Sequence, residues 1–167
     1  IPAYHETRLQ ESLVSLLNAS APTVPVEVIV VINWPEDESQ DNIMISHEAF
    51  NSINLWINQH SSENISFHAL EVGFIPRKKA GVGYARKLGM DAIRRFLEAG
   101  QEDGVIISFD ADSQCDSNYL SSIDAHFRKF PTTDGCSIYF EHPLEGTQFP
   151  QKVYDAIIQY ELHMRYY

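Results

Sequence analysis

One stretch of the sequence constrains the fold more than any other: a short run of apolar and small residues, 105–109, that leads directly into Asp110 and Asp112. A continuous run of this kind after Gly104 predicts a strand buried on both faces, as in a parallel sheet covered by helices. In open α/β sheets, ligands bind beyond the carboxyl ends of the strands. We therefore expect both carboxylates to face a binding site.

Strand and helix patterns alternate along the whole chain. Strands are expected over residues 1–3, 26–32, 65–72, 105–109 and 136–140. Helices are expected over residues 7–17, 47–60, 84–99, 118–130 and from 150 to the end, with Thr7 and Ser46 as caps of the first two. The acidic loop 36–41 is expected to be solvated. The alternation predicts an α/β fold with a mostly parallel sheet flanked by helices on both faces, a Rossmann-like three-layer sandwich.

Charge limits the partners. Acidic residues outnumber Lys and Arg by 23 to 12, giving a formal net charge of -11, which argues against nucleic-acid binding. The few basic residues are clustered, with Arg77, Lys78, Lys79, Arg86 and Lys87 within eleven positions. This local patch indicates a small anionic ligand. No apolar run is long enough to cross a bilayer, and no Cys or His spacing resembles a zinc site.

The Asp110–Ala111–Asp112 segment suits a divalent cation. Mg²⁺ and Mn²⁺ prefer oxygen ligands, and Mg²⁺ is often held by one or two carboxylates together with substrate phosphates. Asp110 and Asp112 are therefore the candidate metal ligands. The alternative is a pair of acids in a solvated turn, in which Asp112 and Ser113 precede the next helix.

Glycines open the helix predicted over residues 84–99. Gly81 and Gly83 would let backbone N–H groups and the helix N-terminus approach a phosphate, and Arg86 adds a permanent positive charge one turn later. Arg86 could equally form a salt bridge with an acid of the Asp110–Asp112 turn. The two roles are compatible, because an arginine beside a metal-binding carboxylate balances its charge.

Four segments resemble a known family when they are taken together. They are Ile-Pro-Ala-Tyr-His-Glu at 1–6, Glu-Val-Ile-Val-Val at 27–31, Gly-Tyr-Ala-Arg-Lys-Leu-Gly at 83–89 and Phe-Asp-Ala-Asp at 109–112. In order and spacing they resemble the signatures of glycosyltransferase family 2, nucleotide-sugar-dependent enzymes of GT-A fold. The resemblance implies that residues 1–167 are the donor-binding part of a single GT-A domain whose acceptor-binding C-terminal part is missing.

The resemblance also implies which residues bind the donor. It places Pro2, Ala3, Tyr4 and Glu6 at the base and ribose, Asn33 at the base edge, Gly83 and Arg86 at the base or phosphates, and Asp110, Ala111 and Asp112 at the ribose and the diphosphate-bound metal. Asn33 stands where the family usually has an acid, and an amide can both donate to and accept from a base.

The activity implied is metal-dependent, inverting transfer of a sugar from a nucleotide-diphosphate sugar to a hydroxyl of a glycan, lipid or small-molecule acceptor. The metal and Arg86 would stabilise the departing diphosphate, and a general base would activate the acceptor. That base is expected beyond Tyr167, with Glu141, His142 and Glu145 on the acceptor side. We expect a cytoplasmic protein that associates with membrane only through a segment beyond Tyr167.

Two other readings remain open. In a phosphohydrolase, Asp110 would be the nucleophile and Asp112 the acid, since Asp-x-Asp-Ser after an apolar strand suits that chemistry as well. Such enzymes usually carry the pair on the first strand, whereas more than a hundred residues precede it here. A non-catalytic nucleotide-sugar binding module is the third reading, because no base is assigned within the chain.

Overall fold

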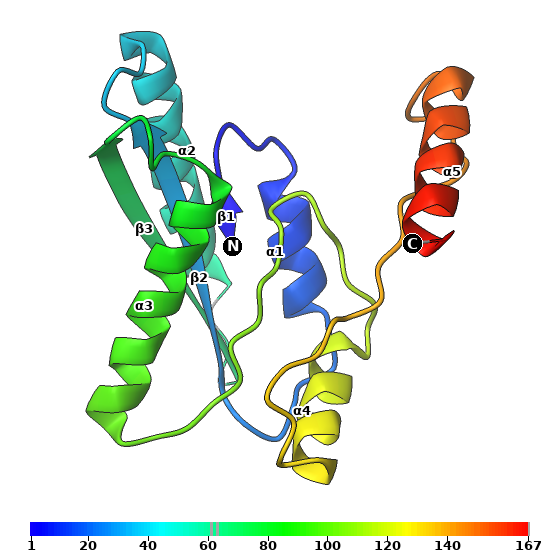
Figure 1. Ribbon diagram of the computed structural model, residues 1–167. Helices are drawn as coiled ribbons and strands as arrows, with labels where there is room; N and C mark the ends of the chain where they lie inside the picture. The colour runs from blue at the N-terminus through cyan, green and yellow to red at the C-terminus, as the bar shows by residue number, and fades with distance from the viewer. Residues whose placement is uncertain (61, 63, 167) are drawn as a thin grey trace. The chain divides into compact units, whose positions relative to one another are not determined.

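The computed structural model describes residues 1–60, 62 and 64–166, which form two compact units, Ile1–Pro131 and Thr132–Tyr167 (Figure 1). The N-terminal unit contains β1 (Pro2–Ala3), α1 (Leu9–Leu17), β2 (Val26–Pro35), α2 (Gln40–Gln59), β3 (Ile65–Ile75), α3 (Val82–Gly100) and α4 (Tyr119–Lys129). The C-terminal unit contains α5 (Gln151–Tyr166). The α/β class predicted from the sequence is confirmed.

A small parallel sheet forms the centre of the N-terminal unit. Its order is β1-β2-β3, with Pro2 opposite Val31 and Val26 opposite Ile65. The central strand β2 is buried over most of its length because its residues are almost all apolar: Val30 is 0% exposed and Val31 1%. Parallel strands of this kind are buried on both sides. β2 also runs three residues further than expected, to Pro35, so Asn33 lies within the strand.

The apolar core joins the sheet to the helices around it. Leu9, Leu13 and Leu16 of α1 pack with Val30 of β2 and Trp56 of α2 in one cluster of buried residues. These leucines follow the helical spacing that predicted α1, since positions three and four apart share a face. None of the described helices is both long enough and apolar enough to cross a membrane.

The starts of two helices differ from the prediction. The side chain of Ser39 accepts a hydrogen bond from the Asn42 backbone N–H (3.2 Å), so α2 begins seven residues earlier than expected and Ser46 lies buried inside it. At α1, the Glu6 carboxylate accepts a hydrogen bond from the backbone N–H of Arg8 (2.8 Å), the residue just before the helix. The N-cap residue is Arg8 and not Thr7. The cap predictions for Ser46 and Thr7 are wrong.

Two of the predicted strands are absent from the sheet. Residues 105–109 and 136–140 are irregular and pair with none of the three strands. Val105 and Ile106 are 45% and 40% exposed, and Tyr139 is 70% exposed. The prediction of a buried strand over 105–109 is therefore wrong. An apolar run indicates a tendency to be buried, but the ladder also requires a partner strand, and β1 offers only two residues.

Candidate functional site

The Asp110–Ala111–Asp112 turn is fixed to α1 by its central residue. Ala111 is 6% exposed and belongs to the core, whereas the carboxylates on either side of it are exposed. The buried hydroxyl of Ser12 donates to the Ala111 carbonyl oxygen (2.6 Å), and Ser113 N–H donates to the Asp110 carbonyl (3.2 Å). Anchoring the alanine turns both acids outward, as a site for a cation requires.

Further contacts from the same face of α1 hold the residues after the turn. Ser15 Oγ accepts from the Cys115 N–H (3.2 Å), and Glu11 accepts from the Gln114 side-chain amide (3.0 Å). Neither Ser12 nor Ser15 was predicted from the sequence as a supporting residue. The available signal was two serines three residues apart beside the leucine stripe of a predicted helix.

Arg86 forms an ion pair with Asp110, as one of the two sequence interpretations predicted. It lies in the first turns of α3, and the preceding residue, Ala85, is fully buried. Arg86 Nε is buried and has no hydrogen-bond partner within the described part of the chain, although other side-chain atoms of the residue are exposed to solvent. The Arg86–Asp110 pair also influences the amino group of Ile1. Burial is the largest cause that lowers the pKa of this group to about 6, and the positive charge of Arg86 lowers it further, whereas the negative charge of Asp110 raises it.

The start of α3 is open. Gly81 has a φ of 145°, a conformation that favours glycine, and a Cβ built at Gly81 or Gly83 would meet no heavy atom of the described residues within 4 Å. By contrast, a Cβ at Gly89 would approach a methyl carbon of Val31 to 3.3 Å, so that glycine serves helix–sheet packing. Packing within the described residues therefore does not require a glycine at position 83, and space remains for a group to approach the first turn of the helix.

Tyr4 belongs to a second cluster, at the carboxyl end of β1. Its hydroxyl donates to Glu38 Oε2 (2.6 Å), and its ring stacks on His5 with centroids 4.2 Å apart. Hydrogen bonds from Tyr4, from the Asn42 amide and from the Ser39 N–H lower the pKa of Glu38 to about 2, while the same bond to Glu38 raises the pKa of Tyr4. An acidic side chain of the loop expected to be solvated is thus held in place.

The same loop is tied to the segment after β3. Arg77 donates to Asp37 (3.1 Å) through its guanidinium and to Glu36 (3.4 Å) through its backbone N–H. The loops that follow β2 and β3 are therefore linked at the carboxyl ends of the parallel strands. This is the edge of an α/β sheet at which ligands bind.

The remaining predicted residues have structural surroundings of their own. Pro2 and Ala3 are buried in β1, and Asn33 is 4% exposed in β2 beside Val72, so these three lie in the sheet and Tyr4 follows it directly. Glu6 carries the contact to Arg8 already described. No hydrogen bond or ion pair among the described residues joins Tyr4 to Arg86, Asp110 or Asp112. The structure thus brings together Arg86 and Asp110, and separately Tyr4 and Glu38.

The positions of the Asp110 and Asp112 carboxylates can be compared with the requirements of the predicted Mg²⁺ or Mn²⁺ site. Among the described residues, no three His, Cys, Asp or Glu side chains gather to form a complete metal site. Two carboxylates one residue apart nevertheless match a magnesium ion that takes its other ligands from phosphates and water. Asp110 is engaged by Arg86, whereas none of the described residues forms a hydrogen bond or ion pair with the exposed Asp112 carboxylate, so Asp112 is the better placed ligand.

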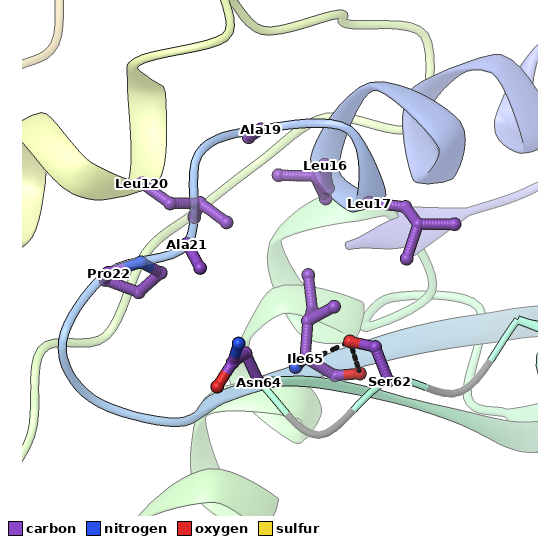
Figure 2. A pocket seen from close by; sticks show the side chains of 9 residues that line it. All are labelled: Leu16, Leu17, Ala19, Ala21, Pro22, Ser62, Asn64, Ile65 and Leu120. Atoms are coloured by element: carbon purple, nitrogen blue, oxygen red, sulfur yellow. Dashed lines mark hydrogen bonds between the residues drawn. The ribbon is translucent and has the colours of Figure 1, made fainter.

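A separate cavity lies at the other end of the strands (Figure 2). It has a volume of about 160 Å³ and is mainly apolar. It is lined by Leu16, Leu17, Ala19, Ala21, Pro22, Ser62, Asn64, Ile65 and Leu120. Ile65 begins β3, so this cavity lies at the amino end of that strand and contains none of the predicted site residues.

Comparison with known proteins gives no family for the chain: no family model, no curated protein and no solved structure matches it. The structure establishes an α/β protein with a three-stranded parallel sheet. The glycosyltransferase resemblance remains a prediction from the sequence.

Proposed function

We propose that the chain is the donor-binding part of a glycosyltransferase of family 2 type, which uses a nucleotide-diphosphate sugar with Mg²⁺ or Mn²⁺. The observation that supports this most is the Arg86–Asp110 ion pair next to the exposed Asp112 carboxylate. Such an arrangement offers a fixed positive charge and a carboxylate to one anionic, metal-bound ligand.

In this proposal each residue has a separate task. Asp112, with Asp110, would hold the metal, which supplies Lewis-acid stabilisation of charge on the diphosphate. The planar guanidinium cation of Arg86 would stabilise the same negative charge on the diphosphate, and its partner Asp110 keeps the guanidinium oriented. The open first turn of α3 supplies backbone N–H groups. Tyr4, fixed by Glu38, offers an aromatic face to a base.

We also propose that the sheet carries helices on both faces, as a GT-A or Rossmann-like sandwich does. Successive residues of a strand point to opposite faces. Val30 packs into the cluster that contains α1 and α2, whereas its neighbour Val31 lies beside Gly89 of α3. This alternation supports helical layers on the two sides of β2.

The phosphohydrolase alternative is less favoured by the same geometry. A nucleophilic carboxylate needs free access to phosphorus, and Asp110 is instead engaged by the Arg86 guanidinium. The non-catalytic binding module uses the same donor site as the transferase. It differs only in lacking a group that activates the acceptor.

Calorimetry with UDP, GDP and inorganic phosphate, each with and without Mn²⁺, tests the proposal. We expect binding of a nucleoside diphosphate that depends on Mn²⁺ and weakens at least tenfold in Arg86→Gln. Arg94→Gln is the matched control, because Arg94 lies on the same helix and pairs along the helix surface with Glu98. Equal binding with and without metal, or turnover of a generic phosphate ester, would reject the proposal.

A further inference from the structure

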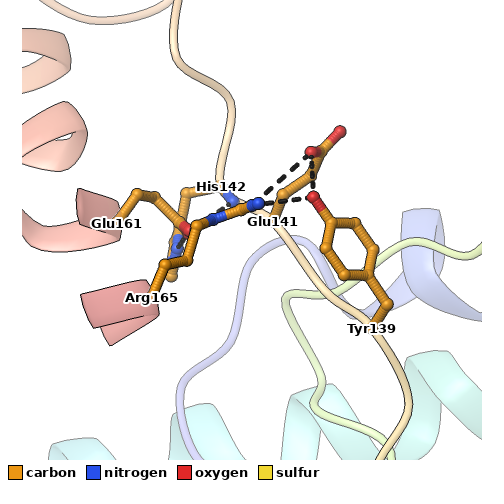
Figure 3. A network of polar contacts seen from close by, with 5 residues as sticks. All are labelled: Tyr139, Glu141, His142, Glu161 and Arg165. Atoms are coloured by element: carbon orange, nitrogen blue, oxygen red, sulfur yellow. Dashed lines mark hydrogen bonds and ion pairs between the residues drawn. The ribbon is translucent and has the colours of Figure 1, made fainter. Parts of the chain in front are cut away.

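The polar groups of the C-terminal unit bind one another (Figure 3). Glu161 of α5 is buried, and its carboxylate accepts hydrogen bonds from the backbone N–H of His142 (3.0 Å) and from Nε of Arg165 (3.2 Å). The Arg165 guanidinium also donates to the Tyr139 hydroxyl (2.7 Å). These contacts join α5 to the segment before it, so this network serves the structure of its own unit.

The outer edge of β3, in the N-terminal unit, is different. β3 is the outermost strand of the sheet: β2 pairs with it on one side, and no strand of the described residues pairs with the other side (Figure 1). Proteins usually protect such an edge with lysine, with proline or by making the strand very short. β3 has eleven residues, and none of them is proline, lysine or arginine. This edge therefore lacks the usual protection against pairing with another strand.

The hydrogen bonds of β2 indicate which residues of β3 face outward. The Val31 N–H donates to the Ile1 carbonyl (2.8 Å), on the β1 side. The Val26 N–H donates to the Asn64 carbonyl (3.0 Å), on the β3 side. In a parallel ladder a residue bonds to the two neighbours of its partner, and the partner of Val26 is Ile65. Even-numbered residues of β3 therefore bond to β2, and odd-numbered residues face outward.

Both ends of the outward-facing run are closed. The Ile65 N–H donates to Ser62 Oγ (3.2 Å), and the Ile65 carbonyl accepts from the Ser62 N–H (3.4 Å). At the other end, Phe74 has a φ of 55° and interrupts the alternation, and the Ile75 carbonyl accepts from the Glu36 N–H (2.9 Å). Between these ends lie the outward residues whose backbone groups form no hydrogen bond with any described residue on that side: Phe67, Ala69, Glu71 and Gly73.

The spacing of these residues suits an antiparallel partner of the same sequence. A two-fold axis at Leu70 places Ala69 opposite Glu71 of the second copy, and Phe67 opposite Gly73 of the second copy. Each such pair of residues can exchange two hydrogen bonds in an antiparallel ladder. All the free outward groups of both copies are then satisfied, which buried or ordered backbone groups require.

The neighbouring registers fit less well. Because side chains alternate between the faces, the axis must pass through a residue for the two sheets to share their faces. An axis one residue earlier would set Gly73 opposite Ile65, whose backbone already binds Ser62. An axis one residue later would set two copies of Glu71 directly opposite each other, and like charges in such a position are destabilising. The axis at Leu70 avoids both conflicts.

The side chains beside this axis are apolar. Leu70 lies opposite Val31 in the ladder and shares its face of the sheet, as does Val72, and both Leu70 and Val72 are half-buried. On the other face, Glu71 is paired with His47 of α2 (2.6 Å), so its carboxylate is directed toward its own chain. A second copy would therefore bring Leu70 and Val72 of both chains together without placing charged side chains directly opposite each other.

We propose that β3 pairs antiparallel with β3 of a second copy of this chain, with the two-fold axis at Leu70. Residues 67–73 of each copy form the contact, and two three-stranded sheets become one continuous sheet. The contact is short, so the dimer belongs to the weak, exchanging class of assemblies. The proposal involves the N-terminal unit alone and does not depend on donor binding.

Sedimentation velocity over a wide range of chain concentrations tests the association. Leu70→Lys places two like charges at the axis in the dimer alone, so we expect at least tenfold weaker association. Ser66→Lys is the matched control, because Ser66 lies on the same face of β3 but outside residues 67–73. Leu70→Glu should weaken association in the same way. An equimolar mixture of Leu70→Lys and Leu70→Glu should associate again, because opposite charges then meet at the axis.

Amide hydrogen exchange of the unmodified chain tests the register without any substitution, and so does not depend on how a variant folds. As the chain concentration rises, exchange should slow several-fold at the outward amides of Phe67, Ala69, Glu71 and Gly73. The amide of Leu70 already faces β2, so its exchange should change little. Circular dichroism of each variant checks that the monomer is folded.

Several results would overturn the inference. They are an unmodified chain that stays monomeric at every concentration, equal association of Leu70→Lys and Ser66→Lys, a mixture of the two Leu70 variants that fails to associate, and concentration-dependent protection at amides other than the four outward ones. Pairing of this edge with an extended peptide of another protein, by a chain that does not associate with itself, would also overturn it and would assign the edge to that partner.

Discussion

The buried hydroxyl of Ser12 provides a quantitative test of how the Asp110–Asp112 turn is held. It donates to the Ala111 carbonyl across 99 residues of sequence, at 2.6 Å. Ser12→Ala leaves that buried carbonyl without its donor, which costs about 1–3 kcal/mol. Alanine recovers at most roughly 0.5 kcal/mol through its higher helix propensity. We therefore expect a net loss of about 1–3 kcal/mol in the free energy of unfolding, relative to a control that makes the same helical exchange.

Ser52→Ala is that control, because Ser52 is an exposed residue of α2. Urea unfolding followed by tryptophan fluorescence gives both values. The two tryptophans, Trp34 and Trp56, are buried in the N-terminal unit and report on it directly. A Ser12→Ala variant that unfolds within about 0.5 kcal/mol of the control, at an unchanged dependence on urea, would refute the role assigned to this hydrogen bond.

Two further predictions concern the carboxyl ends of the strands. A Cβ at Gly73 would lie 2.3 Å from Trp34 Cζ2, so Gly73→Ala should cost about 1–3 kcal/mol in urea unfolding. Gly83→Ala, in the same unit and with no atom of the described residues within 4 Å of the new Cβ, should cost less than about 0.5 kcal/mol. Equal stabilities of the two variants would contradict this packing. Tyr4→Phe removes the largest cause of the low Glu38 pKa, about 2 against an ordinary 4.5, so the NMR titration midpoint of Glu38 should rise. A carboxyl whose pKa is lowered by folding stabilises the protein at pH values above its unfolded pKa, and this stabilisation is lost as the pH falls through the folded pKa. The difference in unfolding free energy between the unmodified chain and Tyr4→Phe should therefore be full at pH 7 and should shrink between about pH 4.5 and pH 2. An unchanged midpoint would contradict the contact.

Local sequence patterns predicted the helices and the two long strands because those elements carry their signal in their own residues. The leucine spacing of α1 and the apolar run of β2 are examples. The start of α2 was predicted at the wrong residue because Ser39 and Ser46 are both acceptable N-cap residues. The choice between them depends on tertiary packing, which buries Ser46 inside the helix.

The failure at residues 105–109 has a different cause. A strand is completed by hydrogen bonds to another strand, and the sequence of a segment does not state whether a partner is present. The Arg86–Asp110 pair could be predicted because the two side chains carry opposite charges. Arg86 lies one turn into a predicted helix, and Asp110 follows the apolar run 105–109. The contacts of Ser12 to Ala111 and of Tyr4 to Glu38 could not, since each joins residues far apart in the chain through a side chain common in many other roles.

The central claim is that Asp112, beside the Arg86–Asp110 pair, holds a divalent cation together with a nucleoside diphosphate. Electron paramagnetic resonance of free Mn²⁺ measures this directly when the chain and UDP or GDP are added together. The control is Asp116→Asn, because Asp116 is an exposed acidic residue four positions after Asp112. We predict that the signal of free Mn²⁺ falls when the unmodified chain or Asp116→Asn is added. Asp112→Asn should bind Mn²⁺ at least tenfold more weakly. Equal Mn²⁺ binding by Asp112→Asn and Asp116→Asn would contradict the account.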